Sequence, residues 1–136
     1  MPEAAKAHTK AGAKAFAVYF WSVADYATRN NDSQPVRALV RTDCAGCTAA
    51  EKFIDETKSR GGSAGGVRNR LAKISVSRRE YNGAPLYDVQ FELTNDPETI
   101  TYPDGSRKQF PTGTTPAHLL LEPVAGGWLV ATLESL

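Results

Sequence analysis

The spacing of apolar residues changes period once along this 136-residue chain, at the glycine-rich stretch GGSAGG of residues 61–66. Before this stretch apolar residues recur every three or four positions, and after it apolar and polar residues alternate. The first pattern is typical of amphipathic helices and the second of strands with one buried face. The order predicts a single α+β domain over residues 1–136, with helices over about residues 3–61 and an antiparallel sheet over about residues 67–136. We expect GGSAGG to be a flexible joint between the two halves.

The helical half contains one long amphipathic stretch, over residues 3–30, and two shorter ones. Val18 and Trp21 lie off its apolar stripe, so we expect a second element or a partner to cover them. Thr48 and Glu51 have the T-x-x-E spacing of a capping box, which predicts that the third helix begins just after them. The stripe of the long helix consists of Phe16, Tyr19, Phe20, Val23, Tyr26 and Ala27.

The second half predicts about five antiparallel strands. Apolar residues alternate with polar ones over residues 72–76 and again over residues 87–93. Asn82-Gly83 stands between these two runs and is a strong signal for a tight hairpin turn. A last hairpin is expected around residues 125–127, and the sheet should have one buried and one wet face.

The charge balance argues against two classes of partner. Sixteen basic and fifteen acidic residues leave a net charge of +1, which gives no overall field for nucleic acid or an anionic membrane. Basic residues do gather around one predicted strand, at residues 68–79, but no aromatic residues alternate with them to stack on bases. We therefore expect no nucleic-acid partner.

The two cysteines, Cys44 and Cys47, leave three interpretations open. A zinc site needs four ligands, and the other candidates, His8 and His118, lie near opposite ends of the chain. A dithiol redox centre needs a Cys-x-x-Cys at a helix start, which is present, but also a preceding buried strand, which is not predicted. A structural disulfide that fixes the turn between the second and third helices explains the pair best, and such bonds are typical of exported domains. We expect no metal and no cofactor.

The order of elements resembles the cone-shaped, nuclear transport factor two-like fold, in which helices pack on a curved antiparallel sheet. The segments AFAVYFWSVADYA (15–27), DCAGCTAAEKFID (43–55) and the Gly pair at 61–62 also resemble a family of uncharacterised exported lipoproteins of actinobacteria. The resemblance implies an extracytoplasmic domain, held at the cell membrane by an N-terminal lipid anchor after a signal peptide. The stretch MPEAAKAHTKAGAKAF has no features of a signal peptide, so a native start and a start downstream of an export signal both stay open.

The resemblance carries no assigned activity, so two function classes remain. The first is a non-catalytic module that binds an unknown protein or a small apolar ligand, and a homodimer is a further expectation. The second is a small enzyme with His118 as its catalytic candidate inside the cone pocket; dithiol redox activity is a third hypothesis. Four aromatic residues are candidates for lining the pocket: Trp21, Tyr19, Tyr87 and Tyr102.

Overall fold

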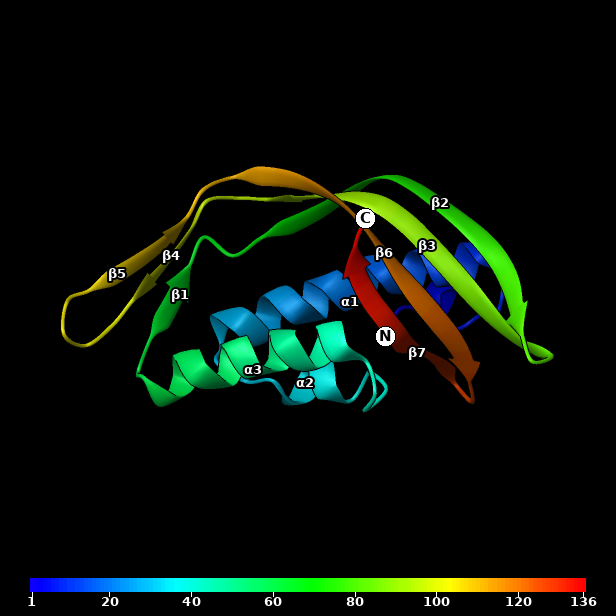
Figure 1. Cartoon of the computed structure of the whole chain (residues 1–136), viewed down its shortest axis with the longest axis horizontal. Helices are drawn as coiled ribbons and strands as arrows, with labels where there is room; N and C mark the ends of the chain where they lie inside the picture. Colours follow the sequence, from blue (N-terminus) through cyan, green and yellow to red (C-terminus); the bar gives the residue numbers. More distant parts are fainter.

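A curved antiparallel sheet arches over the helices in the computed structural model, which describes residues 1–136 (Figure 1). The helices come first: a short 3-10 helix η1 (Glu3–Ala5), then α1 (Lys10–Arg29), α2 (Gln34–Arg37) and α3 (Ala45–Ser59). The strands follow: β1 (Ser63–Gly65), β2 (Asn69–Tyr81), β3 (Ala84–Asn95), β4 (Glu98–Thr101), β5 (Arg107–Phe110), β6 (Gly113–Val124) and β7 (Gly127–Ser135). The α+β class predicted from the change of period is confirmed. No helix combines the length and the apolar character needed to cross a membrane.

The strands form two sheets rather than one. The main sheet has the order β2-β3-β6-β7 and a smaller one has the order β1-β4-β5, with every neighbouring pair antiparallel. Three chain segments run from one sheet into the other, and the two that join β3 to β4 and β5 to β6 pass through a proline, Pro97 and Pro111. Because proline has no N–H to donate, it interrupts the ladder of hydrogen bonds and lets the sheet bend. Asn95 bridges the bend by donating from Nδ2 to the Pro111 carbonyl at 2.9 Å.

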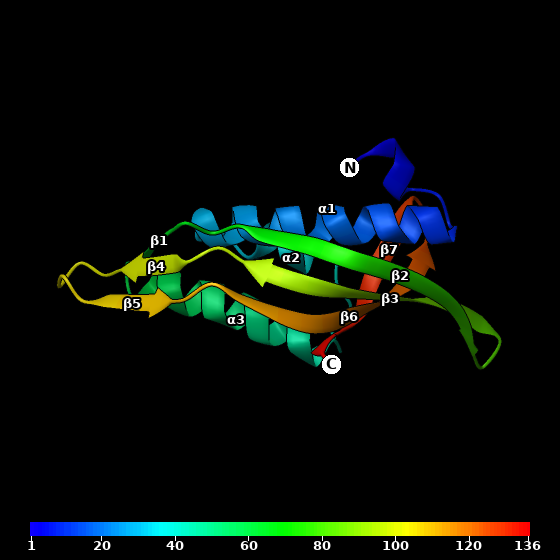
Figure 2. The ribbon, with the colours of Figure 1, turned by 90° about the horizontal axis from the view of Figure 1, so that it is seen from above.

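The hairpin between β2 and β3 turns at Asn82-Gly83, as the sequence predicts. Asn82 has φ of 52° and Gly83 has φ of 80°, the left-handed pair that a two-residue turn of this kind requires. Register shifts at residues 72–75 of β2 and at residues 120–121 of β6 add curvature to the main sheet. The result is the concave face on which the helices lie (Figures 1 and 2).

The long helix begins later than its apolar pattern predicts, at Lys10 instead of near residue 3. Thr9 ends the preceding turn and accepts the N–H of Gly12 on its Oγ1 at 3.0 Å, so it is the N-cap of α1. The chain before it folds back so closely that a Cβ on Gly12 would lie 1.8 Å from the Ala7 carbonyl oxygen. Tyr26 also departs from the predicted stripe, because 52% of it is exposed.

The third helix begins at Ala45, so the predicted capping box is wrong. Cys44 is its N-cap, with Sγ accepting the N–H of Cys47 at 3.2 Å, and Thr48 lies inside the first turns. Thr48 instead donates from its hydroxyl to the Cys44 carbonyl at 3.1 Å. The first turn packs directly on β7, because a Cβ on Gly46 would lie 2.0 Å from the backbone oxygen of Leu133.

The glycine-rich stretch that we expected to be a flexible joint contains β1 and is tied to the end of α1. Asn31 donates from Nδ2 to the Gly62 carbonyl at 2.7 Å, and Arg29 donates to the Val67 carbonyl at 3.1 Å. β1 itself pairs with β4. These bonds hold the smaller sheet beside the C-terminal end of α1, which positions β4 for the site described next.

The main core lies between α1 and the concave face of the main sheet. Tyr87, Val89 and Phe91 of β3 point into it, and the matching β6 residues, Leu119 and Leu121, are fully buried. The residues between them, including Asp88 and His118, therefore point to the convex face. The curved sheet thus has an apolar side against the helices and a polar side away from them.

Candidate functional site

A hollow of about 190 Å³ lies under the sheet, among all three α-helices and the strands β2 and β7. We call it the inner hollow. Eight of its eleven lining residues are hydrophobic, and the other three, Asp25, Thr28 and Asn69, gather polar groups in one wall. An apolar cavity with a few convergent polar groups is the usual character of a small-molecule site. The hydrophobic lining consists of Phe20, Trp21, Ala24, Val36, Ala50, Phe53, Ile54 and Leu133.

Trp21 lines both the inner hollow and a second hollow next to it. Together with Leu133 it also lines an adjoining hollow of about 350 Å³, beside the first turn of α3. Its ring meets those of Phe20 and Phe91 edge-on, at centroid distances of 5.8 and 6.3 Å. Its indole Nε1 is buried and has no hydrogen-bond acceptor. A buried donor without an acceptor costs about 1–3 kcal/mol, so this N–H is an unsatisfied group in the packing around the hollow.

Asp25 forms the polar end of the inner hollow and is 6% exposed. Its Oδ2 accepts the backbone N–H of Asn69 at 2.9 Å, and its Oδ1 accepts from the Asn69 side chain. No lysine, arginine or histidine forms a salt bridge with it. Asp25 is therefore a buried carboxylate held by neutral donors alone.

A second acidic residue on the concave side, Glu98 on β4, lies outside the lining of the inner hollow and lines a separate surface hollow with Pro97 and Phe110. Glu98 alternates with the fully buried Ile100, so it lies on the helix side of the smaller sheet. Its Oε1 is buried and has no hydrogen-bond partner. Burial raises the pKa of the Glu98 carboxyl above its ordinary value of 4.5, and the negative charge of Asp25 raises it further.

Two cations on this side are directed elsewhere. Arg29 gives its guanidinium to the Val67 carbonyl, and the exposed Lys108 lies over two aromatic rings, 5.9 Å from the centroid of Phe53 and 5.4 Å from that of Phe110. Arg68 and Arg70 line a further hollow together with Asp25. Neither Asp25 nor Glu98 forms a salt bridge.

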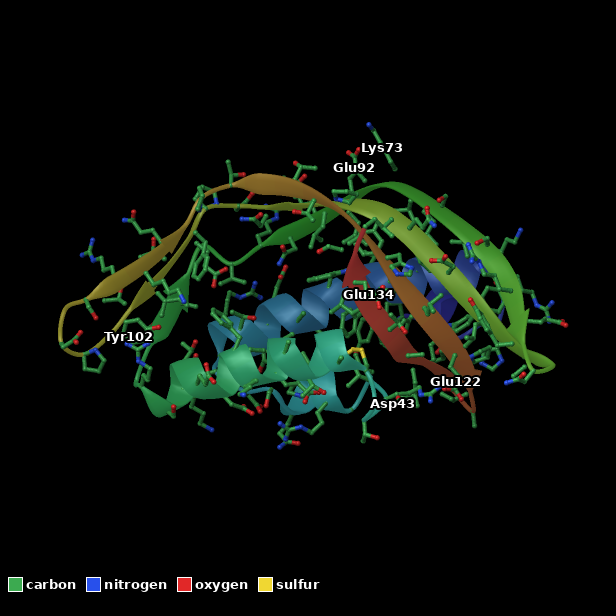
Figure 3. The ribbon with its side chains drawn as sticks, viewed as in Figure 1. Asp43, Lys73, Glu92, Tyr102, Glu122 and Glu134 are labelled. Carbon is green, nitrogen blue, oxygen red and sulfur yellow. A yellow bond between two sulfur atoms is a disulfide. The ribbon has the colours of Figure 1, made fainter.

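Of the four aromatic residues expected to line a pocket, Trp21 alone lines the hollows under the main sheet. Tyr19 packs against Phe16 at the edge of the core. Tyr87 is 6% exposed and donates its hydroxyl to the His8 carbonyl at 3.1 Å, so its role is packing. Tyr102 lies at the far end of the smaller sheet, where the Arg60 guanidinium stacks on its ring at 4.2 Å (Figure 3).

His118 lies on the convex face of the main sheet, so the expectation that it occupies the cone pocket is corrected. The reason is the strand period, which directs its β6 neighbours Ala117 and Leu119 inward. Its Nδ1 is 2.9 Å from Oδ1 of Asp88, and its Nε2 is 3.4 Å from Oε2 of Glu134. Arg79 places Nη2 3.3 Å from the other oxygen of Asp88. We call Arg79, Asp88, His118 and Glu134 the outer cluster; its carboxylates are paired, and no cysteine or hydroxyl nucleophile belongs to it.

The cysteine pair forms a disulfide between Cys44 and Cys47. The bond links the N-cap of α3 to its first turn, and so it closes within one helix instead of between two. Both residues are at most 1% exposed, whereas a dithiol redox centre needs an accessible sulfur. The disulfide fixes the first turn of α3, which forms part of the wall of the larger hollow through Gly46.

The remaining histidine also has a structural role. His8 has Nε2 2.8 Å from the Gly127 carbonyl and 2.9 Å from the Val124 carbonyl, and its ring meets Trp128 edge-on. It therefore ties the N-terminal segment to the β6–β7 hairpin. No three His, Cys, Asp or Glu side chains lie together in a way that could hold a metal ion.

Sequence reasoning missed the two acidic residues of the concave side. The signal for Asp25 was available, because it follows Trp21 by one helical turn and shares its position off the apolar stripe. Glu98 was identifiable as the same-face neighbour of Ile100, but its approach to Asp25 depends on the bend between the two sheets.

Solved structures with the same architecture support the fold. The intermembrane-space region of the chloroplast protein ARC6 has a TM-score of 0.66 at 13% identity, with 96% of this chain and 98% of that chain covered. The association domain of C. elegans CaMKII has a TM-score of 0.57 at 11% identity, covering 93% and 96%. A nuclear transport factor 2 (NTF2-like) superfamily protein from Salmonella enterica serovar Typhimurium has a TM-score of 0.55 at 14% identity, covering 94% and 92%. At these identities the likeness shows the fold alone, and it confirms the cone-shaped architecture.

The sequence itself places the chain in a family. No curated protein matches it. The model of a family of unknown function, DUF6318, matches residues 1–132. The chain therefore belongs to the DUF6318 family.

Proposed function

We propose that this domain is a non-catalytic module that binds a small, largely apolar ligand in the inner hollow. The observation that carries the proposal is the lining of the hollow, in which eight of eleven residues are hydrophobic and the ring of Trp21 is shared with the adjoining hollow. A ligand in the hollow would cover this apolar wall. The volume of about 190 Å³ suits a compact ligand, since sites for drug-sized molecules are larger, about 300–1,000 Å³.

The two tryptophans give a matched test by NMR. Trp21 has a free indole N–H, whereas Trp128 donates its indole N–H to the Ala5 carbonyl at 2.9 Å. In a screen of small fragments against ¹⁵N-labelled protein, a ligand of the inner hollow should shift the Trp21 indole signal and leave that of Trp128 in place. Trp21→Phe should weaken binding by up to about tenfold, because it removes part of the apolar wall that the ligand covers. A screen in which binders shift both signals equally, or in which none shifts Trp21, would contradict the proposal.

The catalytic alternative lacks a specific observation in its favour. It names His118, which lies across the sheet from the hollow and between two carboxylates. We therefore develop the binding hypothesis alone.

We further propose that the full-length protein displays this domain outside the cytoplasmic membrane on an N-terminal lipid anchor. The resemblance to exported lipoproteins and the disulfide support this location, because cytosolic proteins rarely keep such bonds. Thiol titration of natively purified protein should find no free thiol, and labelling of the full-length protein with a fatty-acid analogue should mark it. Two free thiols, or an unlabelled protein, would contradict this location.

A second copy of the chain is the protein partner that we propose. The CaMKII structure with this fold is described as an association domain, which supports the idea by analogy of fold only. Sedimentation of the purified domain should show a dimer at micromolar concentration. A monomer at all concentrations would remove the homodimer without affecting the ligand site.

A further inference from the structure

We propose that Asn82, at the tip of the β2–β3 hairpin, is a site of covalent modification at which the side-chain amide is converted to a carboxylate. The inference goes beyond ligand binding and does not involve the hollows, since none of their lining residues belongs to this turn. It is carried by the exposure of the turn, the free amide of Asn82 and the open space around Gly83.

The turn of this hairpin projects beyond the rest of the molecule (Figures 1 and 2). All four of its residues, from Tyr81 to Ala84, are exposed to solvent. The next pair along the hairpin is Glu80 with Pro85, and proline adds no N–H to the ladder of hydrogen bonds there. The turn is therefore held by its closing pair, Tyr81 and Ala84, and it can open without the loss of a buried contact.

Asn82 differs from the other asparagines in its side-chain amide. Each of the other four donates a hydrogen bond from Nδ2 within the chain, whereas the Asn82 amide has no partner. An amide that is held in this way must break its bond before its carbonyl carbon can turn toward the main chain. The Asn82 side chain is free to make that rotation. The held amides are those of Asn30, Asn31, Asn69 and Asn95.

Gly83 removes a second obstacle, which is steric. A Cβ at this position would meet no atom within 4 Å, so the space around the residue is open. Because glycine has no side chain, Cγ of Asn82 can approach the backbone nitrogen of Gly83. The other four asparagines are followed by residues with side chains, which crowd the corresponding nitrogen: Asn31, Asp32, Arg70 and Asp96.

The reaction needs water and no other reagent. The Gly83 nitrogen forms a bond to Cγ of Asn82, its proton and the side-chain NH2 leave as ammonia, and a cyclic succinimide remains. Water then opens this ring: attack at Cγ gives aspartate, and attack at the main-chain carbonyl carbon gives isoaspartate, in which the main chain runs through the side chain. Either product adds one negative charge, which cancels the formal net charge of +1. Isoaspartate also lengthens a turn whose left-handed geometry requires two ordinary residues.

The experiment follows all five asparagines of the complete chain in one sample. ¹⁵N-labelled protein is kept at pH 8, and its side-chain amide signals are recorded over time by NMR. The Asn82 signals should disappear at least about tenfold faster than those of the other four, because those amides must break a hydrogen bond and pass a following side chain. Mass spectrometry of a digest should find the new acid in the peptide that contains the turn.

Asn82→Gly is the matched control, since glycine adopts the left-handed conformation of the turn and carries no amide. The four remaining asparagines should decay at their wild-type rates, and the turn peptide should stay unmodified. Loss of the Asn82 signals no faster than those of the other four would overturn the inference. Modification of the turn peptide in Asn82→Gly would place the reaction at another residue and would overturn it as well.

Discussion

Buried carboxylates have different partners on the two sides of the curved sheet. On the convex face Asp88 is 3% exposed, and it has both Arg79 and His118 within 3.3 Å. On the concave side Asp25 is 6% exposed and has neutral donors alone, while Glu98 leaves an oxygen with no partner. The buried carboxylate of the convex face therefore has counter-charges, whereas Asp25 and Glu98 form no salt bridge. The binding role that we propose belongs to the concave side, where Asp25 lines the inner hollow.

The basic residues of β2 illustrate the paired face. Arg70, Lys73, Arg78 and Arg79 each lie within 3.3 Å of an acidic oxygen, so the predicted basic strand has its charges matched. Lys73 and Glu92 stand on the outer surface of the arch, away from the helices (Figure 3). Such pairs contribute little individually, about 0–1 kcal/mol each. Asp88 is the exception because it is buried.

The largest effect should follow from Asp88→Asn. This change removes the negative charge beside Arg79 and His118 and replaces one of the two acceptor oxygens with an NH2 group, so one of these partners loses its acceptor. Breaking a buried ion pair costs about 3–5 kcal/mol, and the half-exposed Arg79 reduces this, so we expect a loss of about 2 kcal/mol in the free energy of unfolding. Urea denaturation at pH 7 measures it. Glu134→Gln, at a side chain 64% exposed, should cost no more than about 0.5 kcal/mol; equal losses for the two variants would contradict the distinction.

A smaller effect of opposite sign should follow from Glu98→Gln. Because the pKa of Glu98 is raised in the folded protein, the folded state binds more protons than the unfolded state above pH 4.5. The wild-type protein therefore loses stability through this group as pH rises above 4.5, and the neutral Gln does not. We expect the free energy of unfolding of Glu98→Gln to exceed that of the wild type by about 1 kcal/mol at pH 7 and to equal it near pH 4. Urea denaturation at both pH values measures this, and a destabilised variant at pH 7 would show that Glu98 is paired.

The smallest effect should follow from Glu92→Gln on the convex face. Its partner Lys73 is 76% exposed at the side chain, and water screens the pair. The free energy of unfolding should change by no more than about 0.5 kcal/mol, with no dependence on pH between 5 and 8. A larger change in the same urea experiment would mean that exposed pairs, and not burial, set the electrostatic contrast between the faces.

The sequence predicted the parts of the structure that depend on period and on local turns. The change of period at residues 61–66 separated helices from strands, and Asn82-Gly83 marked its hairpin. The prediction from the sequence failed where a local side-chain pattern competes with a tertiary contact. Thr48 has the spacing of a cap, but the disulfide and the approach of Gly46 to β7 start the helix at Ala45.

The site was less predictable than the fold for a related reason. Trp21 was identifiable because it leaves the apolar stripe, whereas His118 was expected in the cone pocket although it alternates with the inward-facing Ala117 and Leu119. The proximity of Asp25 and Glu98 has no local signal, because these residues are 73 positions apart and meet only through the bend between the two sheets. Long-range electrostatic arrangements of this kind require the structure.

The most direct test of this account is an NMR titration of the Glu98 side-chain carboxyl. We predict a pKa above the ordinary value of 4.5, because burial and the charge of Asp25 disfavour the ionised form. A pKa at or below 4.5 would show that this carboxyl already has a counter-charge on the concave side and would contradict the account.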